Sequence, residues 1–367
     1  MKQRIIAFHL LNDKSGSPKV LRQLLLDWAK QDQFDVHLFS SQNTDGFLSN
    51  LDGVKFHHAW YHFSSQPWLR LIFYWSSQFL LMLRLLFFLK KNDLVYINTV
   101  LPFGAALIAN LKSCRIIYHV HEVTINPRIL KWLLLSIVKK SANEIIYVSN
   151  DVKNAHNIPH IPSHIVYNTL EHTFLNAIER KETKAKLNHI LMVCSLKKYK
   201  GIFEFLHLAK ALRKYQFKLV LNANEAEIKQ FFIGYTLPKN LLLFPSQNNL
   251  HPFYQWADLI LNLSRPDEWI ETFGLTIIEG MAYGLPSIVP PVGGILEVIE
   301  NGVTGFAVDS RDSIQLIETV ERIMEDKNLY NQMSKAALKR LDIFNENTML
   351  SAVRKILQKG TKVSFPF

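Results

Sequence analysis

The sequence contains very few cysteines. Cys114 and Cys194 are the only two among 367 residues, and each lies within an apolar run typical of a β-strand. A disulfide-built scaffold is therefore excluded, and a reducing cytosolic setting is favoured. A signal peptide is not expected either, because the apolar stretch near the N-terminus, Ile5 to Leu11, is only seven residues long and is interrupted by His9. Internal repeats and low-complexity tracts are also missing.

Acidic residues are scarce relative to basic ones. The chain has 31 Asp/Glu against 42 Lys/Arg, for a net charge of +11, and residues 1–180 hold 19 Lys/Arg against 12 Asp/Glu. Such an excess favours a negatively charged partner, which could be nucleic acid, anionic lipid or a phosphorylated substrate. Because no motif for reading bases or a nucleic-acid backbone is present, we expect no nucleic-acid partner.

The chain lacks an uncharged run long enough to cross a bilayer. In residues 68–91, WLRLIFYWSSQFLLMLRLLFFLKK, the charge-free part runs from Leu71 to Leu83, which is 13 residues, whereas about 20 are needed. The bordering Arg and Lys residues and the many aromatics fit a helix lying on an anionic membrane surface. A helix packed in the core of an α/β domain fits the same pattern equally well.

Alternation of apolar, strand-like runs with helix-length segments continues along the chain and predicts two doubly wound, Rossmann-like parallel-sheet domains. A length of 367 residues agrees, since single cores stop growing below this size. The polar stretch 171–188 has no strand pattern. We therefore predict an N-terminal domain at 1–170, a linker at 171–188, a second domain at 189–350, and a C-terminal helix and tail at 351–367 that could cross back to the first domain.

The segment ETFGLTIIEGMAYGLP, residues 271–286, places two carboxylates eight residues apart around an apolar run. A helix from Phe273 to Tyr283 is predicted, with Gly284 in the left-handed position after it and Pro286 preventing its continuation. Glu279 falls inside the apolar run and needs a partner, because an unpaired buried carboxylate costs several kcal/mol. The next residue, Gly280, indicates a close approach to the backbone. Glu271 either serves a ligand near the helix start or merely caps the helix.

Polar clusters follow other predicted strands, where ligands bind in open parallel sheets. The turn NDKSGSPKV contains Gly16, RIIYHVHE ends with His119, His121 and Glu122, and VCSLKKYKG places Lys197, Lys198 and Lys200 before a helix beginning near Gly201. Lysines at a helix N-terminus make better sense with a shared anion. Gly293 and Gly294 open a further helix in PPVGGILEVIENGVTGF, where backbone N–H groups could hold phosphate oxygens.

With these motifs in this order, nearly the whole chain resembles the retaining glycosyltransferases of family 4, which have the GT-B fold of two Rossmann-like domains facing each other across a cleft. The resemblance rests most strongly on the two glutamates, Glu271 and Glu279. It implies that Glu271 contacts the donor sugar and Glu279 the ribose of the nucleotide. One position departs from the family pattern: Ser195 stands where relatives have an arginine, and Lys197 is a candidate substitute.

The resemblance implies a sugar transfer from a nucleoside-diphosphate sugar to a saccharide or lipid-linked acceptor, in cell-surface polysaccharide synthesis. Catalytic roles are implied for Glu271, His121 and Lys200. The implied donor site comprises Gly16, Ser195, Lys197, Lys200, Glu271, Phe273, Gly274, Leu275, Glu279, Gly293 and Gly294. We expect no cofactor, and no metal since no Asp-x-Asp stands near this site. We also expect a cytoplasmic, peripheral membrane location. An epimerase-type relative and a non-catalytic sugar-nucleotide-binding protein are the alternatives.

Overall fold

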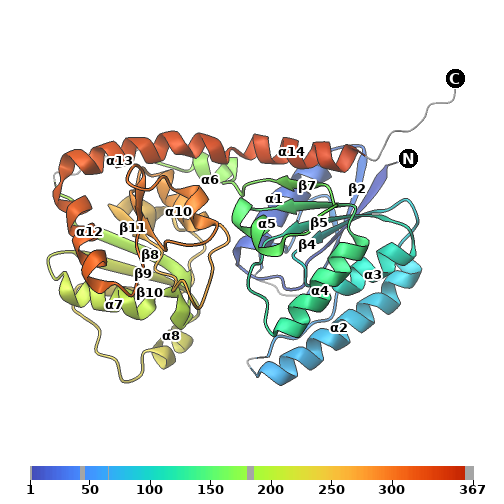
Figure 1. Ribbon diagram of the computed structural model, residues 1–367, viewed down its shortest axis with the longest axis horizontal. Helices are drawn as coiled ribbons and strands as arrows, with labels where there is room; N and C mark the ends of the chain where they lie inside the picture. The colour runs from blue at the N-terminus through green and yellow to red at the C-terminus, as the bar shows by residue number, and fades with distance from the viewer. Residues whose placement is uncertain (1, 42–45, 65, 180–185, 360–367) are drawn as a thin grey trace. The chain divides into compact units, whose positions relative to one another are not determined.

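The computed structural model describes residues 2–41, 46–64, 66–179 and 186–359, and two compact units make up the chain (Figure 1). Unit 1 combines residues 1–167 with the segment from residue 347 onward, and unit 2 comprises residues 168–346. The stretch expected as a linker, 171–188, falls in unit 2, although its residues 180–185 lie outside the described residues. There the short helix α6 (His172–Asn176) packs through Phe174, whose ring stacks on His251.

Unit 1 is built on a seven-stranded sheet in the order β3-β2-β1-β4-β5-β6-β7, and every neighbouring pair is parallel. Its strands are β1 (Gln3–Phe8), β2 (Phe34–Ser40), β3 (Val54–His58), β4 (Leu94–Asn98), β5 (Arg115–Val120), β6 (Glu144–Tyr147) and β7 (Ser163–Ile165). Its helices are α1 (Gly16–Ala29), α2 (Pro67–Phe88), α3 (Phe103–Leu111), α4 (Arg128–Ser141), α5 (Asn150–His156) and α14 (Glu346–Gln358).

Side-chain alternation in the central strands of unit 1 divides its core into two layers. Val95 and Ile97 of β4 point into the cluster formed with α2, α3 and α4. Tyr96, between them, points to the opposite face and packs edge-on against Trp28 of α1. Continuous burial on both faces explains why these strands read as unbroken apolar runs in the sequence.

Unit 2 has a six-stranded parallel sheet in the order β10-β9-β8-β11-β12-β13. Its strands are β8 (His189–Ser195), β9 (Gln216–Asn222), β10 (Leu241–Phe244), β11 (Leu259–Leu261), β12 (Ser287–Val289) and β13 (Gly305–Ala307). Its helices, besides α6, are α7 (Ile202–Ala211), α8 (Glu225–Phe231), α9 (His251–Trp256), α10 (Leu275–Met281), α11 (Ile295–Val298), α12 (Ser313–Glu325) and α13 (Lys327–Arg340), with 3₁₀ turns η1 (Lys198–Lys200) and η2 (Leu341–Phe344).

The helix of the 271–286 segment is followed by a left-handed Gly284, as predicted, but it is shorter than predicted and ends at Met281 rather than Tyr283. Gly284 has φ 67°, its N–H bonds to the carbonyl of Met281, and the N–H of Leu285 bonds to the carbonyl of Gly280. This pair of bonds is the Schellman arrangement. The α-helix begins at Leu275 rather than Phe273, because Gly274 before it has φ 145°, which is not helical. A Cβ on Gly280 would lie 2.9 Å from Ile260 of β11, so the expected close approach is real.

Several short elements were not predicted from the sequence. The edge strand β3 is VKFHH, in which polar residues dominate, so its sequence does not read as an apolar run. Helices α5, α6 and α9 have only five to seven residues each, too few for a 3.6-residue period to be recognised. At the C-terminus, α14 packs on unit 1, where Arg115 donates to the carbonyl of Leu357 at 2.6 Å.

Candidate active site

Each sheet has a point at which its order of growth reverses, and ligands of open α/β sheets bind beyond the strand ends at that point. In unit 1 the reversal lies between β1 and β4, and in unit 2 between β8 and β11. His9 follows β1 and Asn98 ends β4, whereas Lys200 follows β8 and Ser264 follows β11. The candidate site residues therefore form two centres, one in each unit.

Glu271 is the focus of the centre in unit 2. Its Oε1 lies 2.5 Å from Nζ of Lys200 and accepts a hydrogen bond of 2.5 Å from the Ser264 hydroxyl. Burial by itself would raise the pKa of the Glu271 carboxyl. The Lys200 charge and hydrogen bonds from Lys200, Ser264 and Asn262 outweigh burial, so the pKa lies below its ordinary value. Glu271 is thus an ionised, fixed acceptor and does not cap α10, whose N-cap is Gly274.

Two glycines bring the backbone segments of this centre together. Gly201 has φ 76°, and a Cβ there would lie 2.0 Å from the Leu263 carbonyl oxygen. Gly293 has φ 95°, and a Cβ there would lie 2.5 Å from the Glu271 carbonyl oxygen. Neither position can take a larger residue without moving the chain. The loop of Lys200 and the loop of Gly293 consequently pack directly against the segment that carries Glu271.

An aromatic stack holds the side chain of Lys200 from the other side. The rings of Tyr199 and Trp269 are 4.9 Å apart and nearly parallel, and Nζ of Lys200 lies 4.9 Å from the Trp269 ring centre. Arg265 links the segments of the two aromatic residues, since its backbone N–H donates to the Tyr199 carbonyl at 2.8 Å and its carbonyl accepts from the backbone N–H of Trp269 at 2.9 Å. Its guanidinium also pairs with Glu204 at 2.8 Å. Cation–π contact and the Glu271 charge together fix the ammonium group.

Glu279 is buried, with 3% of its surface exposed, and the partner that its sequence context required is Tyr254. The fully buried hydroxyl of Tyr254 donates to Oε2 of Glu279. Burial, and then the neighbouring Glu279 charge, raise the pKa of Tyr254 well above its ordinary value. Tyr254 therefore remains a hydrogen-bond donor to the Glu279 carboxylate.

In unit 1 the orientation of Asn98 sets the tautomer of His121. Nδ2 of Asn98 lies 3.2 Å from the Ser17 carbonyl, which can only accept, so the amide NH₂ must face that way. Oδ1 of Asn98 then faces Nε2 of His121 at 2.9 Å. Nε2 must carry the proton, which leaves Nδ1 of a neutral His121 as a hydrogen-bond acceptor.

The histidines of this centre are neutral. Burial, reinforced by the nearby His119 and His9, lowers the pKa of His121 well below its ordinary value. Burial lowers the pKa of His9 to about 4 and that of His119 to about 3. His119 and His121 are two residues apart at the end of β5 and stand on the same side, with ring centres 4.2 Å apart. By contrast, burial raises the pKa of the Glu122 carboxyl to about 7.

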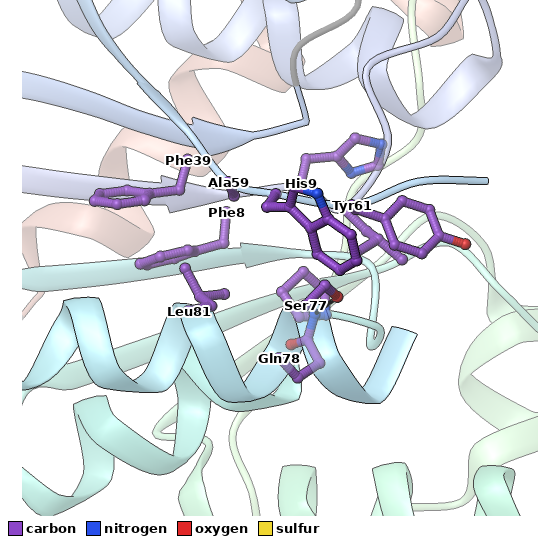
Figure 2. A pocket seen from close by; sticks show the side chains of 11 residues that line it. Phe8, His9, Phe39, Ala59, Tyr61, Ser77, Gln78 and Leu81 are labelled. Carbon is purple, nitrogen blue, oxygen red and sulfur yellow. Dashed lines mark hydrogen bonds between the residues drawn. The ribbon is translucent and has the colours of Figure 1, made fainter. Parts of the chain in front are cut away.

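A small pocket adjoins His9 in unit 1, and Figure 2 shows its lining. Phe8, Phe39 and Leu81 close its apolar side, whereas Tyr61 lies near His9 and Gln78 lies beside Ser77. Its cavity volume is about 10 Å³, which is space for about one water molecule. The pocket is thus too small to hold a sugar.

The remaining predicted site residues are located as follows. Gly16 is the first residue of α1 and is exposed. Ser195 ends β8, and its carbonyl accepts from the N–H of Lys197, which is exposed and precedes η1. The helix expected near Gly201 begins at Ile202, after η1. Three predicted residues lie at the start of α10 or just before α11: Phe273, Leu275 and Gly294.

Sequence reasoning missed Ser264, Tyr254, Trp269 and Asn98. For Ser264 and Asn98 a signal existed, since each is the polar residue at the end of an apolar strand run, as His121 is. Tyr254 and Trp269 had none, because α9 was not recognised and the segment from Arg265 to Ile270 has no regular pattern.

Two family models match the chain: that for glycosyl transferases group 1 over residues 175–340 and that for glycosyltransferase family 4 over residues 15–173. The N-acetyl-alpha-D-glucosaminyl L-malate synthase of Bacillus anthracis is 29% identical over 159 residues, which are 42% of this chain and 40% of that relative. This chain thus spans less than half the length of that relative.

Solved structures share the fold of the chain. Sucrose-phosphate synthase from Thermosynechococcus elongatus superposes with a TM-score of 0.81 at 17% identity, covering 99% of this chain and 100% of that one. Anabaena Alr3699/HepE, solved in complex with UDP-glucose, gives a TM-score of 0.77 at 18% identity, covering 97% and 99%. With two parallel-sheet units of the GT-B type and the two family models matching successive parts of it, the chain belongs to the glycosyltransferase enzymes of family 4.

Proposed function

We propose that this protein transfers a sugar from a nucleoside-diphosphate sugar to a saccharide or lipid-linked acceptor, with retention of anomeric configuration, in cell-surface polysaccharide synthesis. The observation that carries the proposal is the ionised Glu271, held by Lys200 and Ser264 at the reversal point of the second sheet. A fixed anion beside a fixed cation suits a reaction that separates charge.

Breaking the donor's glycosidic bond develops positive charge on the sugar and negative charge on the departing diphosphate. In our proposal Lys200 and the exposed Lys197 stabilise the diphosphate, and Glu271 orients the sugar hydroxyls. Backbone N–H groups at Gly16 and Gly294 add further donors. Groups that are already oriented before the reaction stabilise developing charge without reorganising during it.

Glu279 is assigned to the ribose. Its carboxylate is held in place by the Tyr254 hydroxyl, and in our proposal this carboxylate also accepts a hydrogen bond from a ribose hydroxyl. The relative Alr3699/HepE, solved with UDP-glucose, makes a uridine donor the first to test.

His121 is assigned to a sugar hydroxyl and not to nucleophilic attack. A neutral ring with an unprotonated Nδ1 can accept a hydrogen bond from a hydroxyl, and Asn98 holds the ring in that form. Asn98 thereby acts as a positioning residue through His121.

Replacing Asn98 with Leu is expected to release the His121 tautomer. Turnover should fall about tenfold, as for one lost hydrogen bond of roughly 1.4 kcal/mol, and ¹⁵N spectra should change from the Nε2–H pattern to a mixture of tautomers. In the wild-type protein His121 should stay neutral at pH values where a free histidine becomes protonated, because burial lowers its pKa. Asn154→Leu, on the exposed side of α5, is the control. Unaltered ¹⁵N shifts in Asn98→Leu would remove the assigned role of Asn98.

The reaction itself is tested by measuring thermal stability with a panel of nucleotide sugars, UDP-glucose included. A true donor at 100 times its Kd should stabilise the protein by about 2.7 kcal/mol. Product analysis with and without acceptor then separates transfer from epimerisation, while binding without turnover would indicate a non-catalytic protein. Stabilisation by none of the panel would contradict the proposal.

We propose in addition that turnover needs no divalent metal. Among the described residues, no group of three or more His, Cys, Asp or Glu side chains is arranged to hold one. The expected result is undiminished turnover in chelator. Complete loss, with recovery on adding magnesium or manganese, would refute this part.

A further inference from the structure

Helix α2 exposes a row of large apolar residues and buries two polar ones, unlike a typical amphipathic helix of a soluble domain. Its buried residues include Ser77 and Gln78, and the Gln78 side chain accepts from the N–H of Gly104 in α3. Its exposed side is a stripe of large apolar residues at intervals of three or four: Trp68, Ile72, Trp75, Phe79, Leu83 and Phe87. Phe87 is 93% exposed.

The apolar surface continues over the two neighbouring helices. α2, α3 and α4 lie side by side in unit 1 (Figure 1). On α4, Ile129 is 81% and Trp132 71% exposed, and on α3 Leu107 and Leu111 are exposed as well. A shallow apolar groove between α2 and α3 is lined by Trp75, Ser76, Phe79, Leu80, Met82 and Phe103. We call the exposed face of these three helices the α2–α4 surface.

The charged residues on the α2–α4 surface are all positive. From residue 53 to residue 143 the chain has eleven Lys/Arg and two acids, Asp93 and Glu122, and neither acid lies on α2, α3 or α4. Asp93 is buried and pairs with Arg4 at 3.0 Å, whereas Glu122 follows β5 on the sheet. The basic residues of the helices are Arg70 and Arg84 on α2 and Arg128, Lys131, Lys139 and Lys140 on α4. These positive side chains attract an anionic partner, and no acidic residue of the three helices repels it.

α2 is long and apolar enough to cross a membrane by length and composition, but its packing argues against crossing. Tyr74, Leu81 and Leu85 belong to the main core cluster of unit 1, and the Tyr74 hydroxyl donates to the Leu101 carbonyl at 2.7 Å. A spanning α2 would have to abandon these contacts. The helix can instead keep its buried face in the unit and offer the other face to lipid.

We propose that the α2–α4 surface docks unit 1 onto an anionic lipid bilayer, with the aromatic and aliphatic residues entering the headgroup and upper acyl region and the Arg and Lys residues contacting lipid phosphates. A protein partner would also cover apolar area, but the uniform positive charge favours an extended anionic surface over a patch of mixed charge. This docking would make the protein a peripheral membrane protein.

Flotation of the full chain with phosphatidylcholine vesicles, with and without phosphatidylglycerol, tests the proposal. Binding should require phosphatidylglycerol, weaken as salt is raised, and drop by at least about tenfold in the double variant Phe87→Ser/Ile129→Ser, which removes two apolar contacts. These residues are exposed, so circular dichroism and donor binding should not change. The matched control is Ile314→Ser, since Ile314 lies on a helix of unit 2 and is 70% exposed.

Three outcomes would overturn the proposal. The first is no flotation with either vesicle at low salt. The second is equal loss of flotation in the Ile314→Ser control, which would indicate non-specific adsorption. The third is a concentration-dependent dimer that Phe87→Ser/Ile129→Ser abolishes while the wild-type protein ignores vesicles, because the surface would then belong to a second copy. Each of these results is independent of whether sugar transfer is detected.

Discussion

Replacing Glu271 with Gln should lower kcat by about 10² to 10³, the usual cost of one preorganised charge contact in a transition state, with little change in the affinity for the donor. The amide keeps the size of the side chain but removes the charge that Lys200 now faces at 2.5 Å. Steady-state kinetics with the identified donor and acceptor give kcat and KM separately.

The matched control for this change is Glu268→Gln. Glu268 lies in the same loop, is exposed, and pairs only at the surface with Arg265 at 2.9 Å, so turnover should be nearly unchanged. If Glu271→Gln instead weakened donor binding and left kcat intact, Glu271 would be a binding residue and the assignment of roles would be wrong.

Replacing Glu279 with Ala should chiefly weaken donor binding. Loss of a charged hydrogen bond of about 1.5 to 3 kcal/mol corresponds to a Kd raised about 10- to 150-fold. Titration calorimetry with the donor or its nucleoside diphosphate measures the change. The variant should also be less stable than the wild-type protein, because the buried Tyr254 hydroxyl loses its acceptor.

Tyr254→Phe separates the two effects. It removes the hydroxyl and keeps the carboxylate, so donor binding should weaken by only about tenfold or less, through looser positioning of Glu279. Comparable losses of kcat and affinity in Glu279→Ala, or a larger loss of affinity in Tyr254→Phe than in Glu279→Ala, would show that Glu279 does not serve the ribose.

The sequence determined the local features of the site. The two glutamates, the left-handed Gly284 after α10 and the close approach at Gly280 could all be predicted, because left-handed glycine, proline and helix spacing act over a few residues. The two parallel sheets were equally predictable, since strands buried on both faces read as apolar runs.

The partners of the site residues were decided by the tertiary structure. Lys200 is 71 residues from Glu271, and Tyr254 is 25 residues from Glu279. The Lys200 pair forms because Gly201 lets its loop pack against Leu263. No periodic pattern within one segment can specify a contact between two segments. Asn98 likewise gained its role only when Ser17 and His121 were brought to opposite ends of its amide.

For α2, too, the sequence determined the helix, whereas the tertiary structure decided which of its sides is buried. The sequence determined that residues 67–88 form a basic, aromatic-rich helix, but it left membrane contact and core packing equally open, because apolar residues occur all around the helix. Only packing on unit 1 decided which side is covered: Tyr74, Leu81 and Leu85 enter the core, and the stripe from Trp68 to Phe87 stays exposed. A pattern that is apolar on every side cannot choose its buried face, so that choice depends on the shape and hydrogen bonds of the neighbouring elements.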